Sequence, residues 1–286
     1  MMRRVAWLAV LLLVPVLAQA EMPPDASVKA LAEAWLAKKQ ATGFNAAMTV
    51  ADAAQVQAQF LAVVAKDLGG VAGYKAALTN PAVQKRFGYD KPLRGTLFAK
   101  MILPGGAKVP AAYGSRPVYE GDLVAVVGDA ARLMAAKTPL EALEGIRVFR
   151  PFIELPDLVY DAQVKLDGPH LLAINAGARL GVLGEAIRLP ATEESVKRLA
   201  DMQVDVVDQT GARLGGGKGA DVLDNPLNAV LWLAESLKAE GKALKEGDLL
   251  SLGSFSALLP PKAGSTVTVR YTGLAFLPVE VSVSFE

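Results

Sequence analysis

Residues 119–127 read Tyr-Glu-Gly-Asp-Leu-Val-Ala-Val-Val, two acids followed by an apolar run rich in β-branched residues. Alternate residues of a strand point to the same face, so this stretch predicts a strand that projects Glu120 and Asp122 together before it enters a core. Buried carboxylates that lie side by side repel each other unless a cation compensates their charge. The stretch therefore predicts a β-rich core with a candidate cation site at one end.

The sequence around this strand indicates more strands than helices. Strands are expected at residues 204–208, 266–271 and 279–285, where β-branched residues lie close to Gly or Pro. One strong helix interrupts them within residues 225–241, opened by Asn-Pro and closed by Gly. Strands with few helices, rather than strict alternation of the two, predict an α+β fold.

The amino terminus has a different composition. Residues 1–20 combine two arginines, an apolar run and Ala-Gln-Ala, the pattern of a secretory signal peptide cleaved after Ala20. The run is shorter than the roughly 20 residues that span a bilayer, so no stable membrane span is expected after cleavage. An uncleaved anchor is the alternative. Cleavage would change the net charge from +1 to −1 and leave a periplasmic or secreted protein.

The rest of the chain divides into two expected regions. Residues 21–95 are expected to be helical, with one helix capped by Ser27, a second from about Asp52, and a third within residues 80–88. Residues 96–286 are expected to form the β-rich domain. A hydrophobic fraction of 52% provides a sizeable core, which matters because an exported chain without Cys has no disulfides to hold it together.

Composition and context exclude several kinds of site. The chain has no Cys and one His, His170, which leaves no structural zinc site, no Cys nucleophile and no supported Ser-His-Asp triad. The glycine-rich residues 215–220 follow a hairpin-like turn and lack the context of a dinucleotide fingerprint or P-loop. Nearly balanced charges, 30 basic and 29 acidic residues, give no reason to expect nucleic acid as a partner.

A third acid extends the candidate cation site. Glu154 lies within the apolar, proline-bounded stretch 152–156. Three carboxylates with open positions for water and substrate suit Mg²⁺ or Mn²⁺, which prefer oxygen ligands. The alternative is a solvated strand edge in which Glu154 pairs with Arg147 or Arg150.

Three further segments carry a family resemblance. Residues 73–79 (Gly-Tyr-Lys-Ala-Ala-Leu-Thr), residues 226–234 (Pro-Leu-Asn-Ala-Val-Leu-Trp-Leu-Ala) and residues 247–254, with Gly-Asp and Leu-Gly-Ser, each match a motif. The motifs are Gly-Tyr-Lys-x-Gly-Leu-Thr, Pro-Leu-Asn-Ala-Val-x-Trp-Leu-Ala and Gly-Asp-x-x-x-Ser-Gly-Ser. By these segments the chain resembles the 2-keto-4-pentenoate hydratases of the fumarylacetoacetate hydrolase superfamily.

The resemblance implies a fold and a metal site. It implies an α+β fold with a mixed β-roll core, in which residues 96–286 form a fumarylacetoacetate hydrolase-like catalytic domain beside the helical region. It places Glu120 and Asp122 on the superfamily's Glu-x-Glu metal motif and Glu154 on its third carboxylate ligand. The implied cofactor is Mg²⁺ or Mn²⁺.

The resemblance also implies a reaction. A small 2-hydroxy-2,4-dienoic acid would be ketonised and hydrated to a 4-hydroxy-2-oxo acid, with the metal chelating the substrate and stabilising an enolate. Lys75 matches the family's lysine near the metal, and Asn175 and Ser254 fall on segments that line the pocket. Without the resemblance, Lys75 would be interpreted as a surface lysine after a Gly-Tyr turn. Because the relatives are usually oligomeric, a homo-oligomer is expected.

The sequence departs from the family at three positions. Asp122 replaces the second Glu of the metal motif, and Leu93 and Ile174 stand where acids are usual. These departures leave two alternatives open. One is a lyase like the 4-oxalocrotonate decarboxylases, and the other is a periplasmic protein that binds an oxo acid without turnover.

Overall fold

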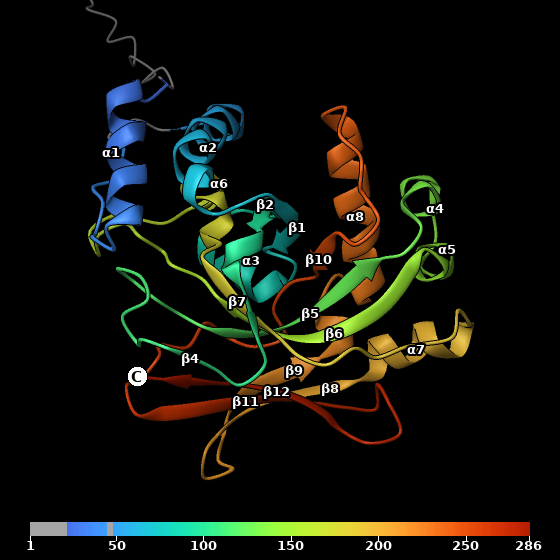
Figure 1. Ribbon diagram of the computed structural model, residues 1–286. Helices are drawn as coiled ribbons and strands as arrows, with labels where there is room; N and C mark the ends of the chain where they lie inside the picture. Colours follow the sequence, from blue (N-terminus) through green and yellow to red (C-terminus); the bar gives the residue numbers. More distant parts are fainter. Residues whose placement is uncertain (1–21, 45–47) are drawn as a thin grey trace, which may run out of the picture.

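The computed structural model describes residues 22–44 and 48–286, so the expected signal peptide at residues 1–20 lies outside the described part of the chain. Two layers of strands lie one above the other, and helices cover the upper layer (Figure 1). The α+β fold with curled mixed sheets that the sequence predicts is confirmed.

The described strands form two sheets. Their bounds are β1 (Val71–Ala77), β2 (Leu93–Phe98), β3 (Ile102–Pro104), β4 (Ala107–Val109), β5 (Glu120–Val127), β6 (Ile146–Leu155), β7 (Leu180–Leu183), β8 (Gln203–Asp208), β9 (Arg213–Lys218), β10 (Leu249–Ser251), β11 (Ser265–Thr272) and β12 (Val279–Phe285). The seven-stranded sheet has the order β2-β1-β10-β5-β6-β7-β3, and the five-stranded sheet has the order β4-β12-β11-β8-β9. In the larger sheet β1 runs parallel to β10 and antiparallel to β2, so that sheet is mixed.

Several helices begin or end at residues that favour helix caps. Their bounds are α1 (Asp25–Leu36), α2 (Val50–Val64), α3 (Pro81–Phe87), α4 (Ala130–Ala135), α5 (Pro139–Glu144), α6 (Gly168–Ala173), α7 (Glu193–Asp201) and α8 (Pro226–Ala239). Asn80 caps α3 by accepting a hydrogen bond from the Ala82 amide, and Gly88 ends that helix in the left-handed conformation. Asn225 caps α8 in the same way.

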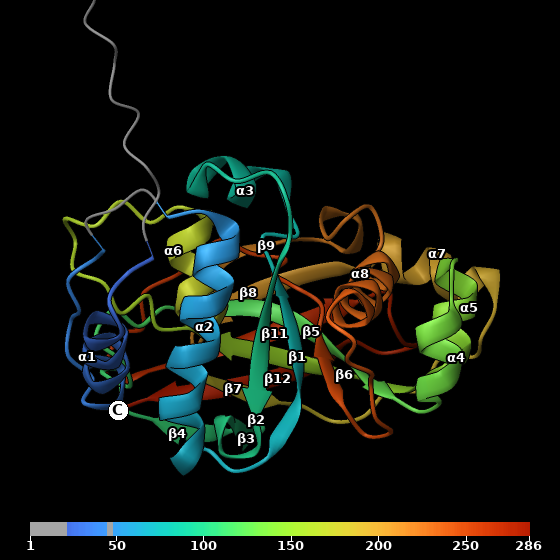
Figure 2. The same ribbon diagram turned by 90° about the horizontal axis from the view of Figure 1, so that it is seen from above.

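Two cores hold these elements together. The larger core lies between the two sheets and beneath α8, and it includes Leu123, Val206 and Leu233. The second core lies under α1, α2 and α6, and it includes Trp35 and Phe60. Figure 2 shows these two groups of helices over opposite ends of the molecule, with β1 and β2 between them. The strand that carries Lys75 therefore lies where the two cores meet.

Several predicted elements are confirmed and others are corrected. The strands expected near residues 204–208, 266–271 and 279–285 correspond to β8, β11 and β12, and the helix within 225–241 corresponds to α8. The region expected to be helical contains two strands, β1 and β2. Here β1 approaches β10 so closely that a Cβ on Gly73 would lie 1.9 Å from the Leu249 carbonyl oxygen, which makes glycine necessary within this strand.

No helix in residues 22–44 or 48–286 is long and apolar enough to cross a membrane.

Candidate active site

The predicted acids lie on two paired strands. Glu120 and Asp122 lie on β5, and Glu154 lies on β6. The antiparallel register places Glu120 directly opposite Glu154, so the two side chains form a cross-strand pair. The structure therefore brings together two acids that are far apart in the sequence.

Lys75 forms a buried ion pair with Glu154. The side chains are 2% and 1% exposed, and the Lys75 ammonium contacts the Glu154 carboxylate. The same ammonium donates a hydrogen bond of 3.0 Å to the Ala176 carbonyl. Lys75 is thus a buried site residue, as the resemblance implied, and not the surface lysine that its local sequence suggested.

The alternative arginine partners of Glu154 are engaged elsewhere. Arg147 pairs with Glu246, and Arg150 donates a hydrogen bond of 2.7 Å to the Gly184 carbonyl. Apart from its contact with Lys75, the Glu154 carboxylate accepts no hydrogen bond from the described residues. The solvated strand edge that the sequence left open is therefore wrong for Glu154, which is buried.

Asp122 is held by the turn that follows β10. Its Oδ1 accepts hydrogen bonds from the amides of Leu252 and Gly253, at 3.1 and 3.0 Å, and its Oδ2 accepts one from the Ser251 hydroxyl. The side chain is fully buried. An ionised carboxylate has about four acceptor positions, so Oδ2 retains one position after these bonds. Asp122 thus fixes the turn that precedes Ser254.

The three acids carry more charge than Lys75 compensates. If all ionise, three carboxylates and one ammonium leave two negative charges. Burial raises the pKa of Glu120 well above its usual value, and the charge of Glu154 raises it further. Burial and then the charge of Glu154 raise the pKa of Asp122 to about 7. Burial and neighbouring charge therefore disfavour the ionised forms of Glu120 and Asp122 unless a cation supplies positive charge.

The surplus of negative charge is one of the features that suit a divalent metal. Oxygen donors, two uncompensated negative charges and a Glu154 carboxylate without hydrogen-bond donors other than Lys75 fit a hard cation. In the described residues, however, no three acidic, His or Cys side chains stand together as a preformed metal-binding group. Glu120 and Glu154 face each other, and Asp122 points into the turn. Their joint role as metal ligands stays a prediction.

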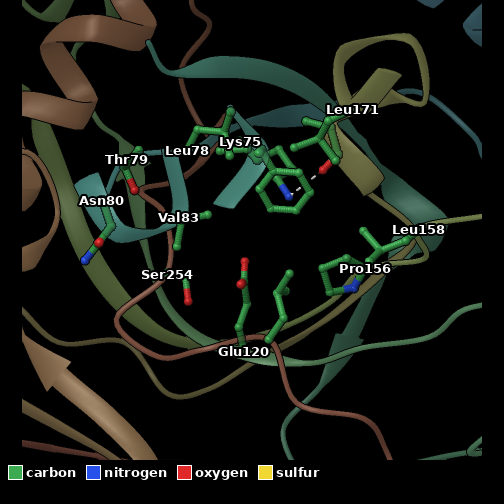
Figure 3. A pocket seen from close by; sticks show the side chains of 14 residues that line it. Lys75, Leu78, Thr79, Asn80, Val83, Glu120, Pro156, Leu158, Leu171 and Ser254 are labelled. Carbon is green, nitrogen blue, oxygen red and sulfur yellow. Dashed lines mark hydrogen bonds between the residues drawn. The ribbon is translucent and has the colours of Figure 1, made fainter. Parts of the chain in front are cut away.

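A cavity opens above these side chains, with a volume of about 450 Å³ including its mouth. It is lined by Lys75, Ala77, Leu78, Thr79, Asn80, Val83, Phe87, Glu120, Pro156, Leu158, Leu171, Ala176, Ser254 and Leu258. Figure 3 shows the Glu120 carboxylate directed into the cavity opposite Lys75, with Thr79, Asn80 and Ser254 on one side and Pro156 and Leu158 on the other. The side with Pro156 and Leu158 is therefore apolar, whereas the other side carries Val83 beside its polar groups.

Ser254 lies where the resemblance expects it, on the side with the polar groups. Its hydroxyl donates to the Ser256 carbonyl at 2.6 Å and accepts from the Ser256 amide at 3.1 Å, which holds the side chain at the cavity. The preceding Gly253 has a φ of 110°, and a Cβ there would lie 2.0 Å from the Thr79 Oγ1. Only glycine allows this turn to pack against Thr79.

Asn175 is used by the backbone and does not line the cavity. Its amide donates to the Thr96 carbonyl at 2.8 Å and accepts from the Thr96 amide at 2.7 Å. Residues 175–177 all have positive φ angles, at 58°, 53° and 74°. This left-handed turn presents the Ala176 carbonyl to Lys75. The side-chain contacts of Asn175 thus hold the backbone beside Lys75, and its contact with substrate stays a prediction.

Sequence reasoning missed the contribution of α3 and the residues before it. Thr79, Asn80, Val83 and Phe87 line the cavity although none was proposed as a site residue. A signal was present, because the matched segment 73–79 ends at Thr79 and continues into the helix cap. Leu93 and Ile174, which replace acids of the family, are buried in the second core and do not line the cavity.

No protein-family model matches the chain. It is 33% identical over 206 residues to the 2-keto-4-pentenoate hydratase of Burkholderia vietnamiensis, covering 71% of this chain and 75% of the relative. Its structure is similar to that of 4-oxalocrotonate decarboxylase from Pseudomonas putida G7 complexed with magnesium and adipate (TM-score 0.78, 25% identity, 92% and 97% of the two chains covered).

A more distant likeness supports the fold alone. Fumarylpyruvate hydrolase from Pseudomonas aeruginosa, in complex with Mn²⁺ and pyruvate, has a TM-score of 0.53 and 16% identity, covering 74% of this chain and 89% of the other. These likenesses confirm the resemblance that the sequence motifs indicated. The chain belongs to the fumarylacetoacetate hydrolase superfamily, with the 2-keto-4-pentenoate hydratases among its relatives.

Proposed function

We propose that this protein is a divalent-metal-dependent hydro-lyase that adds water to a small 2-hydroxy-2,4-dienoate and forms a 4-hydroxy-2-oxo acid. The observation that carries the proposal is the buried pair of Lys75 and Glu154, with Glu120 opposite Glu154, beside a cavity that Lys75 and Glu120 both line. Two proteins similar to this chain supply the reaction class, a 2-keto-4-pentenoate hydratase and a 4-oxalocrotonate decarboxylase.

Glu120 and Glu154 would hold the metal, and Asp122 would join them through the position that remains on its Oδ2. Solved relatives contain magnesium, calcium and Mn²⁺, so a hard divalent cation suits the site, and Mg²⁺ or Mn²⁺ is proposed. When bound, such a cation acts as a Lewis acid that stabilises negative charge on the 2-oxo oxygen of the substrate.

The protein's own groups supply positioning and proton transfer. The Lys75 ammonium, fixed by Glu154 and the Ala176 carbonyl, adds positive charge beside an enolate and can exchange a proton with it. The Thr79 hydroxyl lines the cavity and can donate a hydrogen bond to a substrate oxygen, whereas the Ser254 hydroxyl donates its proton to the Ser256 carbonyl and would first have to release that bond. The apolar residues around them would limit the access of bulk water to a bound substrate.

The direct test follows the ultraviolet absorbance of 2-hydroxypenta-2,4-dienoate in the presence of Mg²⁺. The absorbance should fall with wild-type protein and should not fall after EDTA treatment. Glu120→Gln should lose at least about 100-fold in rate, because changing a residue that only orients a metal ligand already costs about 10- to 100-fold. The exposed Glu185→Gln serves as the matched control and should retain the rate. An active, EDTA-resistant enzyme would contradict the metal dependence.

Two specific observations support other functions. The similarity to 4-oxalocrotonate decarboxylase over nearly the whole chain supports a decarboxylase, which would release carbon dioxide from 4-oxalocrotonate. The second alternative, a protein that binds an oxo acid without turnover, rests on the sequence departures at Leu93 and Ile174, neither of which lines the cavity. Carbon dioxide release identifies the first, and metal-dependent binding without product identifies the second.

Export and assembly belong to the proposal as well. Residues 1–20 would direct the chain to the periplasm, and amino-terminal sequencing of a periplasmic fraction should then begin at Glu21. A cytosolic protein that starts at Met1 would contradict export. A homo-oligomer is proposed because the relatives are usually oligomeric, and light scattering of the purified protein would measure its mass.

A further inference from the structure

A second buried ion pair lies outside the lining of the cavity. The Arg179 Nη1 is 3.1 Å from the Asp157 Oδ2, and the two side chains are 7% and 0% exposed. Neither residue lines the cavity, and the proposed reaction gives neither of them a role. Because a buried ion pair is often no more stable than apolar residues of the same volume, stability alone does not account for a pair at this depth.

The Asp157 carboxylate fixes the loop that follows β6. Its Oδ1 accepts hydrogen bonds from the amides of Arg116 and Val159, at 2.8 and 3.2 Å, and its Oδ2 accepts one from the Ser115 amide at 3.1 Å. A Cβ on Gly114 would lie 2.4 Å from the Asp157 Cγ, so glycine leaves the room that the carboxylate needs. The residues at 156 and 158, on either side of Asp157, both line the cavity. The carboxylate thus sets the course of the chain along one side of the cavity.

The Arg179 guanidinium joins the first helix to this loop. Its Nε donates a hydrogen bond of 2.6 Å to the Tyr113 carbonyl, and its Nη1 donates one of 2.8 Å to the Trp35 carbonyl. The guanidinium carbon lies 4.3 Å from the centre of the Trp35 ring, within the range of a cation–π interaction. Trp35 belongs to the last turn of α1, where carbonyls lack α-helical partners and a cation is favourable. Arg179 therefore holds α1 and the loop after β6 together.

Backbone hydrogen bonds connect the pair to Lys75. The Asp157 amide donates to the Gly177 carbonyl at 2.9 Å, and the Ala176 carbonyl accepts the hydrogen bond of 3.0 Å from the Lys75 ammonium (Figure 3). Two residues of the turn at 175–177 are not glycine and still have positive φ angles, which cost free energy and persist only where the surroundings impose them. Asp157 bonds this turn directly, and its partner Arg179 follows the turn by two residues. The ion pair therefore holds the turn at its carboxy-terminal end.

We infer that Asp157 and Arg179 are positioning residues for Lys75. They hold the left-handed turn that presents the Ala176 carbonyl to the Lys75 ammonium, and so keep the ammonium in contact with both that carbonyl and Glu154. The consequence for catalysis rests on the proposed function, in which Lys75 stands beside the enolate. A pair with a purely structural role would stabilise the fold and leave Lys75 unaffected.

Exchange of the Lys75 ammonium protons with water tests the inference without metal or substrate. In metal-free protein with isotopically labelled lysines, a buried and hydrogen-bonded ammonium exchanges slowly and is followed by nuclear magnetic resonance. Loss of the signal in Lys75→Met assigns it. Asp157→Asn keeps the size of the side chain but supplies one acceptor oxygen where the carboxylate supplies two. The turn should loosen, and the exchange rate of the Lys75 ammonium should rise at least about 10-fold.

Two further variants make the outcome specific. Leu199→Ala removes a buried side chain of α7 that does not line the cavity; it should lose stability and leave the Lys75 exchange rate unchanged. Arg179→Lys keeps the positive charge but lacks the planar fork that reaches three acceptors, so it should also raise the exchange rate, and it decides the outcome if Asp157→Asn does not fold. Wild-type exchange in the folded Asp157 and Arg179 variants, or an equal rise in Leu199→Ala, would show a purely structural pair and overturn the inference.

Kinetics separate the inference from the proposed function. With Mg²⁺ and 2-hydroxypenta-2,4-dienoate, Asp157→Asn should lower kcat at least about 10-fold and change KM by less than about threefold, because a misplaced Lys75 weakens transition-state interactions. Leu199→Ala should retain kcat below its unfolding temperature. A wild-type protein that does not consume the dienoate would refute the proposed function, and the exchange rates would still decide the inference. An active wild type whose Asp157→Asn variant keeps both kcat and slow exchange would retain the function and lose the inference.

Discussion

Replacing Lys75 by methionine removes the buried cation of the site and keeps a side chain of similar length. Glu154, 1% exposed, would lose its partner, and the described structure supplies it with no hydrogen bond in exchange. Glu120 lies opposite on the neighbouring strand and adds a second negative charge. We therefore expect the metal-free Lys75→Met protein to be clearly less stable than the wild type.

The magnitude follows from the burial of the pair. Breaking a buried ion pair by removing one partner costs about 3–5 kcal/mol, because the other charge stays uncompensated. Both side chains are almost inaccessible, so solvent screening does not reduce this cost. For a chain of this size each kcal/mol lowers Tm by about 2–4 °C, which predicts a decrease of about 6–20 °C.

The assay is thermal unfolding of metal-free protein, followed by circular dichroism. The exposed Lys100→Met is the control and should change Tm by only a few degrees. Lys75→Met combined with Glu154→Gln should recover most of the loss, because removing both charges leaves neither uncompensated. If Lys75→Met unfolds at the same temperature as the control, or if the double variant shows the sum of both single losses, the buried pair does not form as described.

Three other predictions follow from the same region. Folding raises the pKa of Asp122 from 3.8 to about 7, so the metal-free protein should lose stability as the pH rises through this interval. In Asp122→Asn, the free energy of unfolding measured in urea should depend less on pH. Gly253→Ala should lower stability by at least about 2 kcal/mol in urea unfolding, since its Cβ would clash with Thr79 and its φ of 110° disfavours alanine; an unchanged midpoint would contradict the turn. Asn175→Leu should cost about 1–3 kcal/mol by leaving the Thr96 backbone groups without partners, while Asn175→Asp should lose less; equal losses would argue against those bonds.

Local patterns in the sequence predicted the elements in which apolar and polar residues recur at the spacing of a strand or a helix. The period-two spacing of Glu120 and Asp122 before an apolar run identified β5, and the Asn-Pro cap with the apolar stripe after it identified α8. The strand β1 was missed because Gly73 and three alanines give its sequence little of the β-branched character that marks a strand. Its status as a strand depends on pairing with β10, which lies far away in the chain.

The arrangement of the site residues likewise depends on contacts between segments that are far apart in the sequence. Sequence spacing placed Glu120 beside Asp122, but only the register of β5 and β6 sets Glu120 opposite Glu154. The burial of Lys75 depends on the left-handed turn at residues 175–177, and no local signal marks that turn. The resemblance found Lys75 because it carries information about tertiary contacts. It could not show that Asn175 supports the backbone, since a motif does not tell which way an amide points.

Because β1 pairs with β10, which lies near the end of the chain, β1 completes its pairing only late in synthesis. Until residues 249–251 have left the ribosome, the strand that carries Lys75 lacks one of its two neighbours and exposes an open edge to other chains. Contacts so distant in sequence form slowly, so a nascent or carboxy-terminally truncated polypeptide would depend on chaperones to avoid aggregation. Fragments that end before β10 should therefore be insoluble rather than partly active.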